Sequence, residues 1–262
     1  MSTRGGMRQS GVVAEIRANS VLPARREEIR LHTTDGLTLI GELALPESAD
    51  PIAAIITVHP LPTHGGMMDS HLLRKAAWRL PALTDVAVLR FNTRGTRSSA
   101  GTSQGSFAGG DGEGLDLAAA VTFARDRGLP TPWLVGWSFG TDVILKHAEV
   151  QPVAGAVLIS PPLRFSTSED LQAWSRTGLP VVALIPEFDD YLRPPAATER
   201  FAEIGESRLV VGQGAKHLWV GEPSVRFVLN EIVRAVIPQY FNQHPTGLPT
   251  QWEGPMERWT DL

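Results

Sequence analysis

The chain has 262 residues, of which 42% are hydrophobic and 20% are charged. This composition is ordinary for a soluble globular protein and excludes disorder of the whole chain. The formal net charge of −4 gives no electrostatic reason to expect a nucleic acid or an anionic membrane surface as a partner. Because the sequence has no cysteine, disulfides, thiolate metal sites and a cysteine nucleophile are excluded.

The beginning of the chain carries no targeting or membrane pattern. Residues 1–27 contain several arginines but lack the apolar core of a secretory signal. The longest apolar runs, 52–58 and 153–159, are far shorter than the ~20 residues of a membrane-spanning helix. We interpret residues 1–27 as a mobile leader and expect a cytoplasmic protein with no membrane partner.

From residue 28 onwards, short β-branched runs alternate with longer helical stretches, which predicts a mostly parallel sheet with helices on both faces. The opening is different, because residues 28–33 and 37–45 flank Asp35-Gly36, a dipeptide that commonly closes an antiparallel hairpin. The apolar run over 52–59 then predicts a central strand that is buried on both faces.

The next part of the chain predicts a parallel β-α-β unit followed by a long loop. A helix is expected over 71–80, stopped by Pro81, and a strand over 86–91. Residues 92–114 are rich in Gly, Ser and Thr, and a loop of that length is usually functional. A helix over about 115–127 follows.

The second half continues the alternation and ends in a tail. It predicts strands over 133–137, 153–159, 180–185 and 207–211, and helices over 141–150, 194–204 and 222–236. Residues 241–262 are rich in proline and fit neither a helix nor a strand by pattern. We therefore expect one domain over 28–240 and a C-terminal tail over 241–262.

The strongest motif is Gly136-Trp137-Ser138-Phe139-Gly140, which fits G-x-S-x-G. In that motif the serine occupies a strained turn between a strand and a helix, and its hydroxyl is exposed above the sheet. The motif here stands between an apolar strand and a helical segment, as this arrangement requires. Ser138 is the predicted nucleophile.

A serine hydroxyl needs an adjacent base, and histidine is the usual one because its ordinary pKa lies near neutrality. His217 lies in a glycine-rich loop after the last strand and before the last helix, where a side chain can face the strand ends. No nearby set of carboxylates or thiolates completes a metal site around His59, His64 and His71. We predict His217 as the base and expect no metal.

The third group must be a carboxylate that orients the imidazole, and the place to look is the loop after the strand at 180–185. Asp189 and Asp190 both stand there. Asp189 is preferred, with Asp190 as the alternative. The chain order Ser138, Asp189, His217 matches the order of Ser, Asp and His in one serine-hydrolase fold and differs from the orders in others.

On these residues, over roughly 28–240, the chain resembles the α/β-hydrolase superfamily, and specifically its small bacterial members with a His-Pro loop, an Arg-Gly loop and a short G-x-x-D loop. The resemblance implies an α/β-hydrolase fold with a mostly parallel central sheet, an antiparallel N-terminal hairpin and helices on both faces. It also implies a structural role for Arg94. The G-x-x-D loop departs from the family pattern, because Pro186 stands at the glycine position.

The resemblance implies two backbone N–H groups that hold the oxyanion. Pro60 has no N–H to give, so Leu61 becomes the donor from the His-Pro loop, and Phe139, after the nucleophile, is the second donor. Only residues 161–179 stand where many members insert a cap domain, so the site is expected to be open. The apolar side chains expected near it are Leu61, Phe139, Phe165, Trp174, Leu218 and Trp219.

The sequence therefore predicts a serine hydrolase that cleaves a carboxylic ester of a small to medium substrate through an acyl-enzyme on Ser138. No cofactor is required, and the expected partner is a small-molecule acyl substrate. Thioesterases, amidases or peptidases and acyltransferases use the same three residues, and a binding protein can keep the fold without turnover. The oligomeric state is left open.

Overall fold

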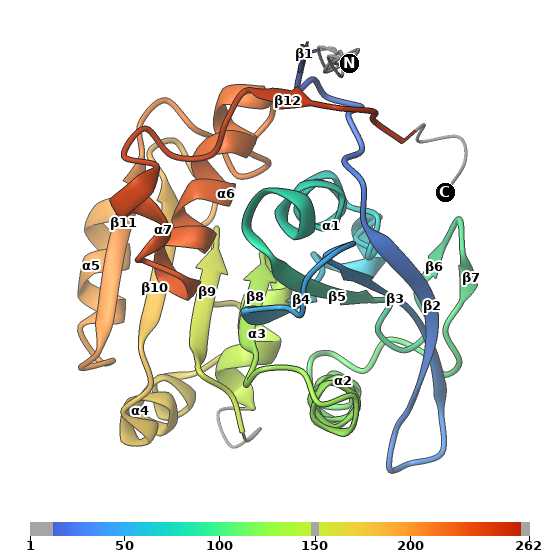
Figure 1. The fold of residues 1–262 in the computed structure, drawn as a ribbon. Coiled ribbons are helices and arrows are strands. Elements are labelled where there is room, and N and C mark those ends of the chain that lie inside the picture. The colour runs from blue at the N-terminus through green and yellow to red at the C-terminus, as the bar shows by residue number, and fades with distance from the viewer. Residues whose placement is uncertain (1–12, 148–151, 258–262) are drawn as a thin grey trace, which may run out of the picture.

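The computed structural model describes residues 13–147 and 152–257. Its centre is an eight-stranded sheet with the order β11-β10-β9-β8-β4-β5-β3-β2 (Figure 1). The strands are β2 (Arg25–His32), β3 (Thr38–Leu45), β4 (Ala53–Val58), β5 (Val86–Phe91), β8 (Trp133–Trp137), β9 (Gly155–Ile159), β10 (Val181–Pro186) and β11 (Ser207–Gly212). β2 pairs antiparallel with β3 and β3 antiparallel with β5, whereas the other neighbours are parallel. The predicted parallel sheet with an antiparallel N-terminal hairpin is confirmed.

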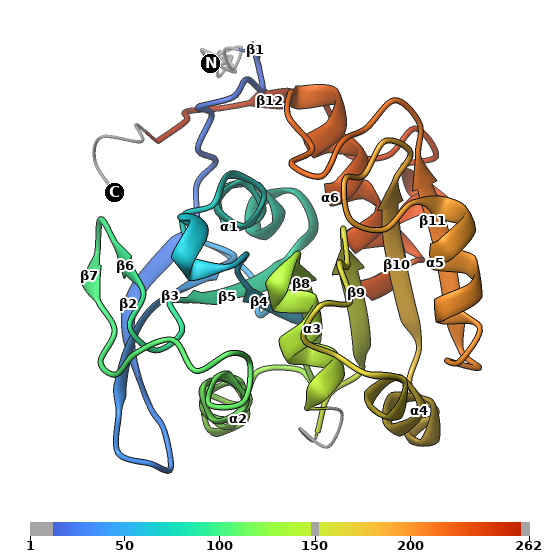
Figure 2. The same cartoon turned by 180° about the vertical axis from the view of Figure 1, so that it is seen from behind.

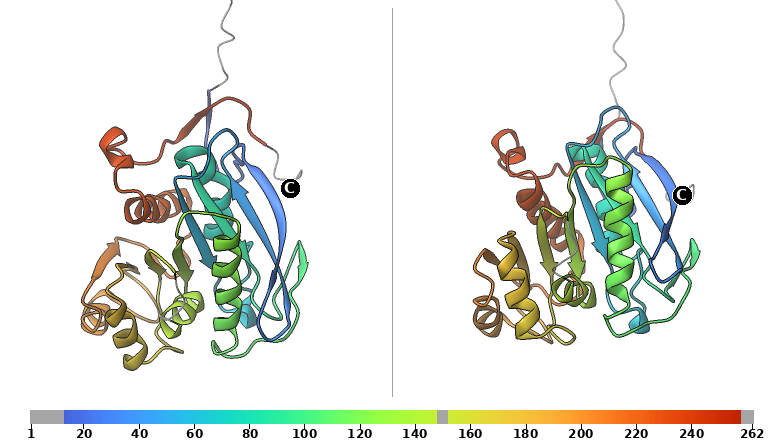
Figure 3. Two further views of the ribbon diagram at one scale, coloured as in Figure 1. Left: turned by 60° about the horizontal axis from the view of Figure 1, so that its bottom comes forward. Right: turned by 90° about the horizontal axis from the view of Figure 1, so that it is seen from below.

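Helices cover both faces of this sheet (Figures 1 and 3). They are α1 (His71–Thr84), α2 (Glu113–Asp126), α3 (Phe139–Lys146), α4 (Ser168–Thr177), α5 (Pro194–Phe201), α6 (Glu222–Val236) and the short α7 (Tyr240–Gln243). α1 and α6 pack on one face, where Leu72 and Val228 join one apolar core, while α2, α3, α4 and α5 close a second core with Phe139 and Phe201. Every residue of β9 and β10 is buried, as expected of strands covered on both faces.

The expected end of the first helix at Pro81 is wrong, because α1 continues through Pro81 to Thr84. Proline lacks the N–H that would bond to the carbonyl four residues earlier, at Ala77. Here Arg26 Nη1 donates to Ala77 O at 3.0 Å. A side chain from β2 thus replaces the missing backbone donor, and the helix tolerates the proline.

The sequence analysis did not predict α4 or the strands β6 and β7. α4 lies within residues 161–179 and begins with a capping box in which Thr167 and Asp170 exchange side-chain and backbone bonds. In the long loop, β6 (Arg97–Ser98) and β7 (Gly101–Thr102) form a small hairpin. The helix expected over 141–150 appears as α3, and residues 148–151 lie outside the described residues.

At the top of Figure 1, β1 (Val13–Glu15) pairs antiparallel with β12 (Gln251–Glu253), so segments from the two halves of the described chain lie side by side there. Leu22 is buried, as is Leu248 in the C-terminal segment. The expectation of a leader over 1–27 is therefore corrected for residues 13–27, which pack on the body and include the start of β2. The expected tail likewise contributes a strand and a core side chain. Residues 1–12 of the expected leader lie outside the described part of the chain.

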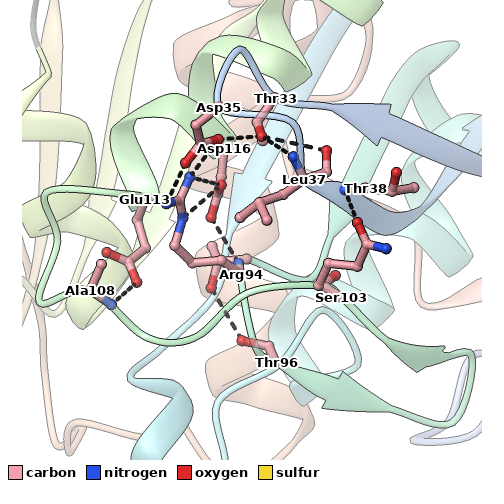
Figure 4. A network of polar contacts seen from close by, with 12 residues as sticks. Thr33, Asp35, Leu37, Thr38, Arg94, Thr96, Ser103, Ala108, Glu113 and Asp116 are labelled. Carbon is pink, nitrogen blue, oxygen red and sulfur yellow. Dashed lines mark hydrogen bonds and ion pairs between the residues drawn. The ribbon is translucent and has the colours of Figure 1, made fainter.

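Arg94 fixes the long loop to the body (Figure 4). Its Nη2 donates to Asp116 Oδ1 at 2.8 Å and its Nη1 to Asp35 Oδ2 at 3.0 Å. The loop is thereby tied both to α2 and to the turn between β2 and β3, which agrees with the structural role expected for Arg94. None of the helices in residues 13–147 and 152–257 is long and apolar enough to cross a membrane.

Candidate active site

Ser138 lies on the tight turn between the carboxyl end of β8 and the start of α3. Figure 2 shows these two elements side by side. Its backbone has φ 53° and ψ −121°, a strained conformation for a residue other than glycine. The flanking glycines make the turn possible. A Cβ on Gly140 would lie 2.1 Å from Val58 O, and one on Gly136 would lie 2.7 Å from Gly140 C.

The structure brings Ser138, His217 and Asp189 together. Ser138 Oγ lies 2.9 Å from His217 Nε2, and His217 Nδ1 lies 2.9 Å from Asp189 Oδ2. In the tautomer that these partners favour, the serine hydroxyl donates to the ring and the ring donates to the carboxylate. Such a line of contacts allows a proton to pass from the hydroxyl to the imidazole.

Asp189 is the better placed of the two candidate carboxylates. Its side chain is buried, and its Oδ1 accepts hydrogen bonds from the backbone N–H groups of Tyr191 at 2.8 Å and Leu192 at 3.3 Å. Asp190 is exposed, and its side chain has no hydrogen bond within the described residues. The carboxylate that reaches His217 is thus fixed by its own loop.

Buried groups behind His217 hold its backbone. The His217 carbonyl accepts from Trp137 Nε1 at 3.2 Å and from Ser160 Oγ at 3.1 Å. Trp219 Nε1 in turn donates to Ser160 Oγ at 2.8 Å. Trp219 therefore supports the histidine loop from beneath, and the expectation that it lies near the substrate is wrong.

Ser138 opens into a cavity of about 300 Å³. Four of the expected apolar side chains line it: Leu61, Phe139, Phe165 and Leu218. Trp174 does not, because it is buried in the core beneath α4. The lining residues that sequence reasoning missed include His64, Arg164 and Tyr191, which come from three different loops. No sequence pattern links these positions, so only the fold reveals them.

The predicted oxyanion donors, Leu61 and Phe139, line the same cavity. Neither of their N–H groups donates to another group within the described residues. Leu61 precedes a short 3-10 helix, η1 (Pro62–His64), which folds the loop back so that Gly66 N donates to Leu61 O at 3.0 Å. A donor to an oxyanion must not already be bonded to another group, and both N–H groups meet that condition within the described residues.

His59 supports this loop from inside the protein. Its Nδ1 donates to Pro60 O at 2.6 Å, and its Nε2 accepts from Thr93 N at 3.1 Å. Burial lowers the pKa of His59 to about 4, so the ring is neutral near pH 7. Within residues 13–147 and 152–257, no group of three or more His, Asp or Glu side chains is placed to hold a metal ion.

Comparison with known proteins gives similarity to solved structures. Neither a family model nor a curated protein matches the chain. A serine hydrolase without a lid from Xanthomonas campestris is 30% identical, with a TM-score of 0.67, over 82% of this chain and 97% of that one. An α-β serine hydrolase homologue from Coxiella burnetii is 24% identical, with a TM-score of 0.65, over 79% and 96% of the two chains. A Pyrococcus furiosus esterase, at 17% identity and a TM-score of 0.68 over 87% and 99%, shares the fold.

Proposed function

The chain belongs to the α/β-hydrolases, and on that premise we propose that it hydrolyses carboxylic esters of small to medium size through an acyl-enzyme on Ser138. The observation that carries this proposal is the unbroken line from Ser138 Oγ through His217 to Asp189, with 2.9 Å at each contact. The apolar wall of the cavity beside Ser138 favours a small-molecule acyl substrate.

In the first half of the reaction, His217 Nε2 takes the Ser138 proton while Oγ attacks the ester carbonyl carbon. The C–O bond to the alcohol then breaks, and the proton passes from His217 to the leaving alcohol. In the second half, His217 takes a proton from water, the hydroxide attacks the acyl carbon, and the acid leaves as Oγ regains its proton. No cofactor takes part in these steps.

Two backbone N–H groups act on the charge that develops at the carbonyl oxygen. Leu61 and Phe139 supply them, and one such donor is typically worth about 2.7–4 kcal/mol in the transition state. Asp189 holds the His217 ring with Nε2 free to accept a proton and stabilises the imidazolium that forms. Asp190 takes no part.

The test uses para-nitrophenyl acetate and butyrate as substrates. We expect turnover by the parent and a loss of at least about a thousandfold in kcat for Ser138→Ala and His217→Ala, because residues that act as a unit fail together. Asp189→Asn should also lose most of the activity, whereas Asp190→Asn, its matched control, should stay within about twofold. Undiminished turnover by Ser138→Ala, or equal losses in the two aspartate variants, would refute the assignment.

A further inference from the structure

The charge around the candidate site differs from that of the whole chain. The sequence has a formal net charge of −4, yet no aspartate or glutamate is among the described residues that line the cavity. The charged side chain among its described lining residues is that of Arg164. Asp189 is buried behind His217 and already accepts its Nδ1–H. A ligand in the cavity therefore meets positive charge without an opposing carboxylate in the wall.

The Arg164 guanidinium is available to a ligand. It is exposed, and its side chain has no ion pair or hydrogen bond within the described residues. Its Cζ lies 5.8 Å from the centre of the Tyr191 ring, and that ring packs edge-on against His217 at 4.7 Å between centroids. The guanidinium thus lies over an aromatic ring that itself contacts the predicted base.

The backbone that carries Arg164 is anchored to the helix that follows the nucleophile. Asp142, on α3, is buried and accepts from Ser166 N at 3.0 Å and from Ser166 Oγ at 2.6 Å. Burial raises the pKa of Asp142, while these bonds and the backbone N–H groups of Phe165 and Arg164 oppose that rise. The segment is thus fixed relative to Ser138 even though the tip of Arg164 is exposed.

We propose that the preferred substrates of this site are esters whose acyl part ends in a carboxylate, and that Arg164 is the residue that recognises this carboxylate. A guanidinium presents a planar pair of N–H donors that matches a carboxylate. This inference rests on the proposed esterase function and names its substrate class. Glu187 and Asp190, on the neighbouring loop, do not line the cavity and form no ion pair with Arg164.

The test compares two esters of nearly equal size. One is the para-nitrophenyl monoester of glutaric acid, which carries a carboxylate, and the other is its neutral methyl para-nitrophenyl diester. We expect a higher kcat/KM for the charged ester, mainly through KM, and a decline of this preference as salt is added. In Arg164→Gln the ratio of the two kcat/KM values should fall about tenfold, the lower end for one hydrogen bond to a charged group.

Two further variants separate recognition from general charge. Arg164→Lys should keep part of the preference, because it retains the charge but loses the paired donors. Arg176→Gln removes one exposed positive charge on α4, away from the cavity lining, and should leave the ratio unchanged. An unchanged ratio in Arg164→Gln, or an equal fall in Arg176→Gln, overturns the inference while the esterase proposal stands. If neither glutarate ester is hydrolysed while para-nitrophenyl butyrate is, this inference alone fails; if none of the three is hydrolysed, both proposals fail.

Discussion

The residues that line the cavity are held in place by buried residues behind them. The strained Ser138 backbone depends on glycines at 136 and 140, since a side chain at either position would collide with backbone atoms. His217 is held through its carbonyl by Trp137 and Ser160. The loop bearing Leu61 rests on the neutral ring of His59. Each of these supports is buried, so their removal should affect stability as well as chemistry.

His59 makes stability depend on pH in a definite direction. Its folded pKa, about 4, lies below its ordinary value of 6.5, so the unfolded chain binds a proton that the folded protein does not. The stability it contributes is therefore present above about pH 6.5 and is lost as the pH falls towards 4. Between pH 7 and pH 5 we expect its loss to lower the free energy of unfolding by about 2 kcal/mol.

Urea denaturation at the two pH values measures this effect. His59→Gln should show a pH dependence that is smaller by that amount, whereas His32→Gln, at an exposed histidine, should keep the parent's dependence. Equal pH dependence in the parent and in His59→Gln would contradict the buried neutral state of His59.

For single residues, the sequence predicts the nucleophile, the carboxylate and the base, because a serine hydrolase needs these three groups and they occur in the expected chain order. Ser138 is marked by its motif, and His217 by its loop after the last strand. The sequence alone does not distinguish Asp189 from Asp190. The structure of the turn does, because it directs the Asp189 carboxylate inward. Arg164 and Tyr191 carry no motif, because their places at the cavity depend on how separate loops meet.

Among the elements, the segment that joins β9 to β10 does more than connect them. It supplies Arg164 and Phe165 to the cavity wall and then continues into α4. The sequence analysis predicted no helix there, and in the structure two of the 10 residues of α4, Leu171 and Trp174, are buried. The length of α1 also depends on a tertiary contact. The donor that replaces the missing N–H of Pro81 comes from β2, so the helix continues beyond the proline.

The bond between Ser166 and Asp142 is the contact that fixes this segment. Ser166→Ala removes the hydroxyl that donates to the buried carboxylate at 2.6 Å. We expect the free energy of unfolding to fall by about 2 kcal/mol, the range for a hydrogen bond to a charged group, and KM for esters to rise as the wall loosens. Ser168→Ala, which removes an exposed hydroxyl on α4, should change stability by less than about 0.5 kcal/mol. Equal effects of the two variants on stability and on KM would argue against the anchor.

Across the whole molecule, the described segments 13–27 and 241–257 pack against α1 and α6, and Leu22 N donates to Trp78 O on α1 at 2.9 Å. Leu248 packs in the core on the face that these helices cover, and Arg226 Nη2 donates to its carbonyl at 2.8 Å. The patterns of 13–27 and 241–262 did not show this, because β1 and β12 have three residues each. A strand that short is recognised only when its partner is present. The strands of the central sheet, in contrast, have five to eight residues each, and their apolar runs are clear in the sequence, although their order in the sheet is known only from the structure.

Leu248→Ala measures how much the C-terminal segment adds to the body. The side chain is only 2% exposed, so its truncation should lower the free energy of unfolding by about 3 kcal/mol. Ile52→Ala, at a position 58% exposed, serves as the control and should cost less than about 1 kcal/mol. Thermal and chemical unfolding of both variants check this. A loss in Leu248→Ala no greater than in Ile52→Ala would mean that the segment is not part of the cooperative unit.

Whether Ser138 is an activated nucleophile can be measured without knowledge of the natural substrate. The purified protein and its Ser138→Ala variant are treated with a fluorophosphonate, and their intact masses are recorded. The proposed mechanism predicts a single adduct on the parent and none on the variant, since only a serine with an adjacent base reacts readily. An unmodified parent, or equal labelling of the variant, would contradict it.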